Sequence, residues 1–74
     1  MIEFYTMKES LCSEDVGSFT TYGIGVCENN QRLEYISDVF LDQQKAEQFV
    51  VLCTRLQLDP LHLSDVVEDA VSSL

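Results

Sequence analysis

Residues 19–28, Phe-Thr-Thr-Tyr-Gly-Ile-Gly-Val-Cys-Glu, decide the fold of this sequence. Tyr22, Ile24 and Val26 alternate with smaller or polar residues, and a period of two is typical of a strand that buries one face. We expect these three side chains to point inward. The segment therefore predicts a strand whose opposite face carries Thr21, Gly23, Gly25 and Cys27.

Two further strands are predicted beside this one. Residues 2–11 form the first, and the small, acidic and glycine residues at 13–18 predict the turn that follows it. Asn29-Asn30-Gln31 predicts a hairpin turn, because Asn adopts positive φ angles at low cost. The third strand, residues 32–39, changes its alternation after Tyr35, which predicts a bulge or bend near Ser37.

Two amphipathic helices are predicted after residue 41, where apolar residues recur at intervals of three and four. Asp42 is expected to cap the first helix, and Asp59 and Pro60 are expected to begin the second. The apolar face of the first helix comprises Ala46, Phe49, Val50, Cys53 and Leu56. That of the second comprises Leu63, Val66, Val67, Ala70, Val71 and Leu74.

These elements predict an α+β fold in the order β-β-β-α-α, a three-stranded antiparallel β-meander followed by two helices packed on one face. The 74 residues are expected to form one small domain, residues 1–74, because a chain of this length has room for a single core. Such a chain buries only about 60% of the surface that its unfolded form exposes, so the core is marginal. Association with a second copy is one way to supplement it.

The charge of the chain is strongly acidic, with 13 Asp and Glu against 4 Lys and Arg and a formal net charge of −9. The four basic residues are scattered singly along the sequence and offset this charge nowhere. We therefore expect no binding to nucleic acid and none to an anionic membrane surface. A basic protein is the partner that this charge favours.

An apolar outer face of the sheet is the main indication of function. Two helices can cover only one face, and the other face carries Phe19, Gly23 and Gly25. Glycine in a strand marks either a bulge, the simpler interpretation, or a shallow groove that a second sheet or a partner's aromatic ring enters. We therefore predict these three as interaction residues, with homodimerisation through the face or the edge of the sheet.

A second candidate surface is the polar side of the second helix, where His62 is followed by Asp65, Glu68 and Asp69. The spacing of His62 and Asp65 could orient an imidazole for base catalysis, and the carboxylates could hold a divalent cation. The sequence has no nucleophile elbow, phosphate-binding glycine loop or alternating calcium loop. We therefore predict no enzyme activity, no catalytic residue and no metal or cofactor, and we assign these four residues to protein contact.

The cysteines Cys12, Cys27 and Cys53 are odd in number and widely spaced, which makes a disulfide framework unfavourable. With His62 they match the ligand number of a structural zinc site, but their wide spacing argues against such a site. Cys12 and Cys27 could face each other across the first hairpin, as two free thiols in a reducing compartment. No segment reaches the roughly 18 apolar residues of a membrane span, and the N-terminus lacks the basic and apolar regions of a signal peptide. We expect a cytoplasmic location.

Three segments resemble a known family: Tyr22-Gly23-Ile24, residues 36–39 (Ile-Ser-Asp-Val) and residues 60–69 (Pro-Leu-His-Leu-Ser-Asp-Val-Val-Glu-Asp). Over roughly its last two thirds the chain resembles short, uncharacterised proteins of Gram-positive anaerobic bacteria that share a domain of unknown function. Residues 62–69 are the most specific part, and Ala70-Val71 then stand where the family pattern has an aromatic and an aliphatic residue. The resemblance implies a bacterial cytosolic protein and no known activity.

The function predicted from these observations is a non-enzymatic protein–protein interaction module that engages a second copy of itself or another protein. Two alternatives remain open. One is an acidic mimic that occupies the nucleic-acid site of a basic protein, which the net charge permits. The other is a small enzyme or metal site around His62.

Overall fold

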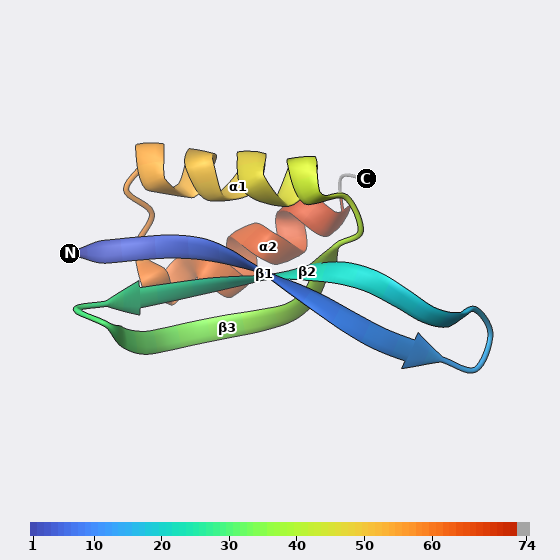
Figure 1. Ribbon diagram of the computed structural model, residues 1–74. Coiled ribbons are helices and arrows are strands. Elements are labelled where there is room, and N and C mark those ends of the chain that lie inside the picture. The colour runs from blue at the N-terminus through green and yellow to red at the C-terminus, as the bar shows by residue number, and fades with distance from the viewer. Residues whose placement is uncertain (73–74) are drawn as a thin grey trace.

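The computed structural model describes residues 1–72 and has three strands followed by two helices (Figure 1). The sheet has the order β1-β2-β3 with both pairs antiparallel, and both helices lie on one side of it. The predicted β-β-β-α-α fold is therefore confirmed. The strands are β1 (Ile2–Ser13), β2 (Gly17–Glu28) and β3 (Gln31–Phe40), and the helices are α1 (Gln43–Arg55), the short 3-10 turn η1 (Pro60–His62) and α2 (Leu63–Ser72).

The core lies between the helices and the inner face of the sheet. Ile24 and Val26 of β2 are fully buried there, and Tyr22 is partly buried against them, so the predicted inward face is confirmed. Burial of large apolar side chains of this kind is the main stabilising term for a small domain. The other buried apolar residues are Phe4, Val39, Phe40, Ala46, Phe49, Cys53, Leu63 and Val67.

The first helix begins and ends for local reasons. Asp42 caps it as predicted, because its Oδ1 accepts a hydrogen bond of 2.8 Å from the backbone N–H of Gln44. Leu56 was predicted on the apolar face, and this is wrong: its side chain is 65% exposed. The helix ends at Arg55 and the chain turns sharply through Gln57, whose φ is 52°, so Leu58 packs against the core instead.

The second helix begins later than predicted. The Asp59 carboxylate accepts a 3.0 Å hydrogen bond from the N–H of Leu61, and Pro60 then opens the 3-10 turn η1, so the α-helix itself begins at Leu63. The predicted apolar stripe is buried at two positions, half-buried at two and 42% exposed at Val71, and Leu74 lies outside the described residues. In residues 1–72 no helix is both long and apolar enough to cross a membrane.

The turns and the bulge lie where the sequence predicts them. Asn29 and Asn30 have φ angles of 52° and 68° and form the two-residue turn between β2 and β3. Residue Tyr22 pairs with Phe40 whereas Ile24 pairs with Ile36, so three residues of β3, at 37–39, stand opposite a single residue of β2. The bulge predicted near Ser37 is therefore confirmed.

The strands β1 and β2 extend further than predicted. Residues 17–21 of β2 pair with residues 9–13 of β1, and no residue of β3 pairs with them on the other side. We call these two segments the distal ribbon and the rest of the sheet the proximal sheet. Figure 1 shows the distal ribbon projecting away from both helices, with its turn at the far end. The molecule thus has a three-stranded, helix-covered part and a two-stranded, uncovered part.

Candidate functional site

The predicted interaction residues lie on two separate surfaces. Phe19, Gly23 and Gly25 belong to β2 and point, by their alternation with Ile24, to the outer face of the sheet. The second group, which we call the acidic group, lies on η1 and α2, on the opposite side of the sheet (Figure 1). The structure therefore does not bring the two predicted groups together. All four members of the acidic group are exposed: His62, Asp65, Glu68 and Asp69.

The space above the two glycines is filled by tyrosines of the same chain. A Cβ atom at Gly25 would collide with the ring of Tyr5, and one at Gly23 would collide with the ring of Tyr35 and lie 2.9 Å from the carbonyl oxygen of Ile36. The space that a partner's aromatic ring would enter, in the second of the two interpretations of these glycines, is therefore occupied by the protein's own rings. Aromatic side chains that cover glycines across a sheet are a known way to stabilise it.

The two tyrosines form a small aromatic layer on the outer face. Their ring centroids are 6.4 Å apart and the planes are inclined by 19°, which is a stacked arrangement. The guanidinium carbon of Arg32 lies 5.4 Å from the centroid of Tyr35, within the range of a cation–π interaction. Sequence reasoning missed Tyr5 and Tyr35, although Gly25 stands beside both in the register, Tyr5 on β1 and Tyr35 on β3.

A hydrogen-bond network fixes the bulge of β3 next to this layer. The Glu9 carboxylate accepts hydrogen bonds of 2.9 and 3.0 Å from the Ser37 hydroxyl and one of 3.0 Å from the N–H of Asp38. The buried Thr21 hydroxyl lies 2.7 Å from Asp38 Oδ1 and 2.9 Å from the carbonyl oxygen of Phe40, and donates to them. These contacts hold Asp38 at a φ of 56°, which is unfavourable for a residue with a Cβ.

The network shifts the pKa values of two groups in opposite directions. The backbone hydrogen bond from Asp38 lowers the pKa of Glu9 below 4.5, and the Ser37 hydroxyl adds to this. Burial raises the pKa of Tyr35 above 10.0, and the nearby Glu9 carboxylate adds to that effect. Among the described residues, the hydroxyl oxygen of Tyr35 is buried and has no hydrogen-bond partner. Both shifts follow from contacts within the bulge and the aromatic layer.

An apolar patch covers the distal ribbon. Val16 and Leu41 are each 72% exposed, and with Phe19 they line a hollow of about 500 Å³. Leu11 stands directly opposite Phe19 in the strand pairing and extends the apolar surface. We call Leu11, Val16, Phe19 and Leu41 the distal patch. Phe19, one of the predicted interaction residues, thus lies in the one part of the sheet that neither helix covers (Figure 1).

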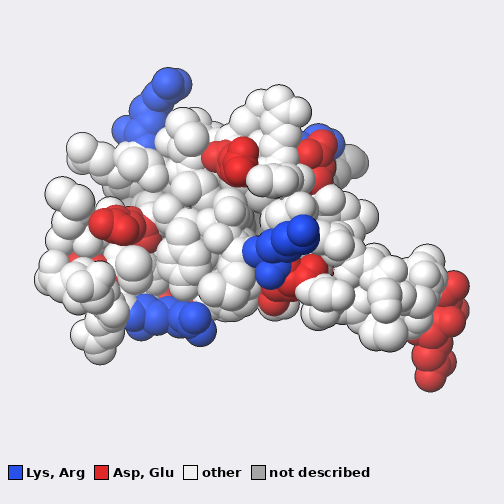
Figure 2. Space-filling view, viewed as in Figure 1, with Lys and Arg blue, Asp and Glu red and all other residues white. Residues whose placement is uncertain are grey.

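Acidic side chains mark the tip of the same ribbon. Glu14 and Asp15 lie in its turn, and Figure 2 shows acidic atoms gathered at the projecting end of the molecule. The basic side chains visible in this view are separated from one another. The scattered basic residues expected from the sequence are therefore also scattered on this face, which is unlike the continuous basic surface of a nucleic-acid-binding protein.

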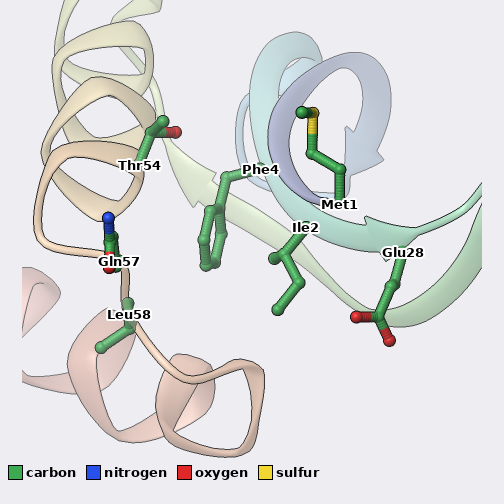
Figure 3. A pocket seen from close by; sticks show the side chains of 7 residues that line it. All are labelled: Met1, Ile2, Phe4, Glu28, Thr54, Gln57 and Leu58. Atoms are coloured by element: carbon green, nitrogen blue, oxygen red, sulfur yellow. The ribbon is translucent and has the colours of Figure 1, made fainter.

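Two neighbouring hollows lie at the opposite end of the sheet. The first has a volume of about 470 Å³, and Figure 3 shows Phe4 between the strand residues Ile2 and Glu28 and the helix-side residues Gln57 and Leu58. The second has a volume of about 380 Å³ and lies between the start of β1, the β2–β3 turn region and η1. Ile2 and Glu28 line both, so the two hollows are neighbours.

His62 and the three cysteines are the residues on which the alternatives of a catalytic pair and a metal site depend. In the described part of the chain no hydrogen bond or ion pair joins His62 to Asp65, and no group of three potential metal ligands is found in residues 1–72. Cys12 pairs with Ser18 and Cys27 with Glu3, so the two cysteines do not face each other across the first hairpin. The thiols of Cys12, Cys27 and Cys53 are all free.

Comparison with known proteins identifies a family and no function. A family model described as a family of unknown function, DUF6514, matches residues 1–73. The match extends beyond the last two thirds of the chain, which is the part that carries the resemblance in the sequence. No curated protein and no solved structure matches the chain.

Proposed function

The chain belongs to the DUF6514 family, and because that family has no assigned activity, we propose from its surface that the protein is a non-enzymatic interaction module that forms a homodimer through the distal ribbon. The observation that carries the proposal is the distal patch. It brings together Leu11 and Phe19 on the ribbon strands, Val16 in the turn between them and Leu41 just after β3. Exposed apolar patches of this kind mark surfaces that contact another protein.

The marginal stability of the ribbon supports the same proposal. A two-stranded ribbon without a third strand or a helix is at best weakly stable in water. A second copy related by a two-fold axis would place one distal patch against the other and remove both from water. Strand β1 is also an edge of the sheet over all 12 of its residues, so its backbone groups can pair with a second strand.

A cytoplasmic location is part of the proposal. The three cysteines are free, and one of them, Cys12, is exposed on the ribbon. Free, exposed thiols are typical of a reducing compartment. The absence of enzyme activity is likewise proposed, because the titratable groups that the structure brings together, Glu9 and Tyr35, belong to the bulge and the aromatic layer.

The experiment is a measurement of mass in solution by light scattering and sedimentation over a range of protein concentrations. The protein should be a dimer, and the double variant Val16→Lys/Leu41→Lys should weaken it at least about tenfold, which corresponds to about 1.4 kcal/mol. Both side chains are 72% exposed, so the fold should survive, and thermal unfolding checks this.

Val51→Lys provides the matched control, because Val51 is an exposed apolar residue on α1 and the charge introduced at each site is the same. It should leave the dimer unchanged. The matched double control is Val51→Lys/Leu52→Lys, since Leu52 is also exposed on α1. A protein that stays monomeric at high concentration would contradict the proposal. So would a dimer that weakens equally in the double variant and in the double control.

A further inference from the structure

An apolar hollow with acidic edges lies at the end of the sheet opposite to the distal ribbon. Ile2, Leu33 and Leu61 form its apolar lining, and Leu61 is 84% exposed. Its volume of about 380 Å³ falls in the range of sites that receive a ligand or an anchoring side chain. These residues come from β1, β3 and η1, so three elements far apart in the sequence build one surface.

The edges of this hollow are acidic. Glu28, Glu34 and Asp59 line it, and no Lys or Arg does. In the described part of the chain the carboxylates of Glu28 and Glu34 form no hydrogen bond or ion pair. Arg32 is the nearest basic residue in the sequence, but its guanidinium lies against Tyr35 on the outer face. We call the six residues Ile2, Glu28, Leu33, Glu34, Asp59 and Leu61 the acidic-rimmed hollow.

This combination selects the occupant by charge. An anionic ligand would be repelled by three carboxylates, and a purely apolar one would leave Glu28 and Glu34 without a partner. A segment with Lys or Arg on both sides of an apolar residue satisfies both parts of the surface. Seven residues line the hollow, far fewer than the roughly 20–30 residues a side of a standard interface between folded proteins, which favours a short peptide segment.

We propose that the acidic-rimmed hollow binds a basic, partly apolar segment of another protein, with an apolar side chain against Leu33 and Leu61 and cationic groups next to Glu28 and Glu34. The proposal is independent of the homodimer, because none of the six residues belongs to the distal patch. The net charge of −9 strengthens the attraction at long range and so increases the rate of association.

The test uses a fluorescent peptide of alternating Lys and Leu, blocked at both ends, titrated with the full chain at two salt concentrations. Binding should be saturable, and Glu28→Gln/Glu34→Gln should weaken it at least about tenfold. Leu61→Ser should weaken it by a similar factor. Higher salt should weaken binding to the unmodified chain more than binding to the double Gln variant, because the variant has lost two of the attracting charges.

Matched controls separate the hollow from general charge attraction. Glu14→Gln/Glu47→Gln removes two exposed carboxylates elsewhere, and Leu56→Ser removes an exposed apolar side chain on another surface. Both should bind the peptide as the unmodified chain does. The absence of binding, an equal loss in the control variants, or equal binding of an oligolysine without Leu would overturn the proposal. The titration is then repeated with Val16→Lys/Leu41→Lys, in which the dimer is weakened. Peptide binding that this variant retains depends on the hollow and not on the dimer.

Discussion

The proximal sheet and the distal ribbon share the strands β1 and β2 and differ in what pairs with them and covers them. In the proximal sheet Phe4, Ile24 and Val26 are buried under the helices, and Tyr5 and Tyr35 cover the other face. The distal ribbon has neither a third strand nor a helix, and its apolar residues stay partly in water. Alternating side chains are therefore present in both regions, but only the proximal sheet gains the burial that a second layer provides.

The largest expected effect comes from removing a core side chain of the proximal sheet. Ile24 is fully buried in the middle of β2, and Ile24→Ala should destabilise the protein by about 2–5 kcal/mol, because it leaves a cavity under the helices. A domain of this size has a free energy of unfolding of only about 5–10 kcal/mol, so much of it would be lost. Urea unfolding followed by circular dichroism measures the change.

The control for this substitution is in the distal ribbon. Thr20 is exposed on β2, and Thr20→Ala should change the free energy of unfolding by at most about 0.5 kcal/mol. If Thr20→Ala were as destabilising as Ile24→Ala, the ribbon would be as tightly packed as the proximal sheet. The distinction between the two regions would then be wrong.

The next largest effect compares two glycines of β2. Gly23→Ala should cost about 1–3 kcal/mol, because the new Cβ meets the Tyr35 ring and the backbone of the bulge, which cannot move away freely. Gly17→Ala should cost about 1 kcal/mol through its φ of 74° alone, since no atom lies within 4 Å of the added carbon. Both are measured by chemical denaturation.

The tyrosine layer gives this prediction its control. In Gly23→Ala/Tyr35→Leu the obstructing ring is absent, so the added Ala should cost less than it does when Tyr35 is present. A double-mutant cycle measures this difference. Equal costs in both backgrounds would show that the ring does not restrict Gly23.

Most of the fold was accessible from the sequence because each element has a local cause. The alternation of Tyr22, Ile24 and Val26, the Asn29-Asn30 turn and the Asp42 cap act within a few residues, and all are confirmed. Leu56 was misplaced because the apolar period continues past the last helical residue, Arg55, and the reversal at the helix end is not part of that period.

The surfaces were harder to predict because they depend on contacts between strands. An apolar outer face was expected at Gly23 and Gly25, but the exact register that places Tyr5 and Tyr35 over them cannot be read from the alternation of one strand. The acidic-rimmed hollow was also not predicted, because its residues come from elements distant in sequence. The placement of Phe19 on the outer face needed only the alternation within β2, without knowledge of the neighbouring strands.

The smallest expected effect is at the junction of the two regions, where the Glu9 side chain reaches from β1 to the bulge of β3. The pKa of Glu9 is lowered in the folded protein, so folding favours its ionised form. The resulting stabilisation is present above the ordinary value of 4.5 and is lost as the pH falls through the lowered pKa. The side chain is partly in water, so we expect less than about 1 kcal/mol.

The measurement is the free energy of unfolding of the unmodified chain and of Glu9→Gln between pH 7 and pH 3. Glu9→Gln should be less stable at pH 7, and the difference should shrink below pH 4.5, where Glu9 itself becomes neutral. Glu14→Gln in the ribbon turn is the control, because Glu14 forms no hydrogen bond in the described part of the chain. A difference for Glu9→Gln that stays constant with pH would show that its hydrogen bonds to Ser37 and Asp38 do not depend on its charge, and the bulge would then owe its stability to Thr21 and the strand pairing alone.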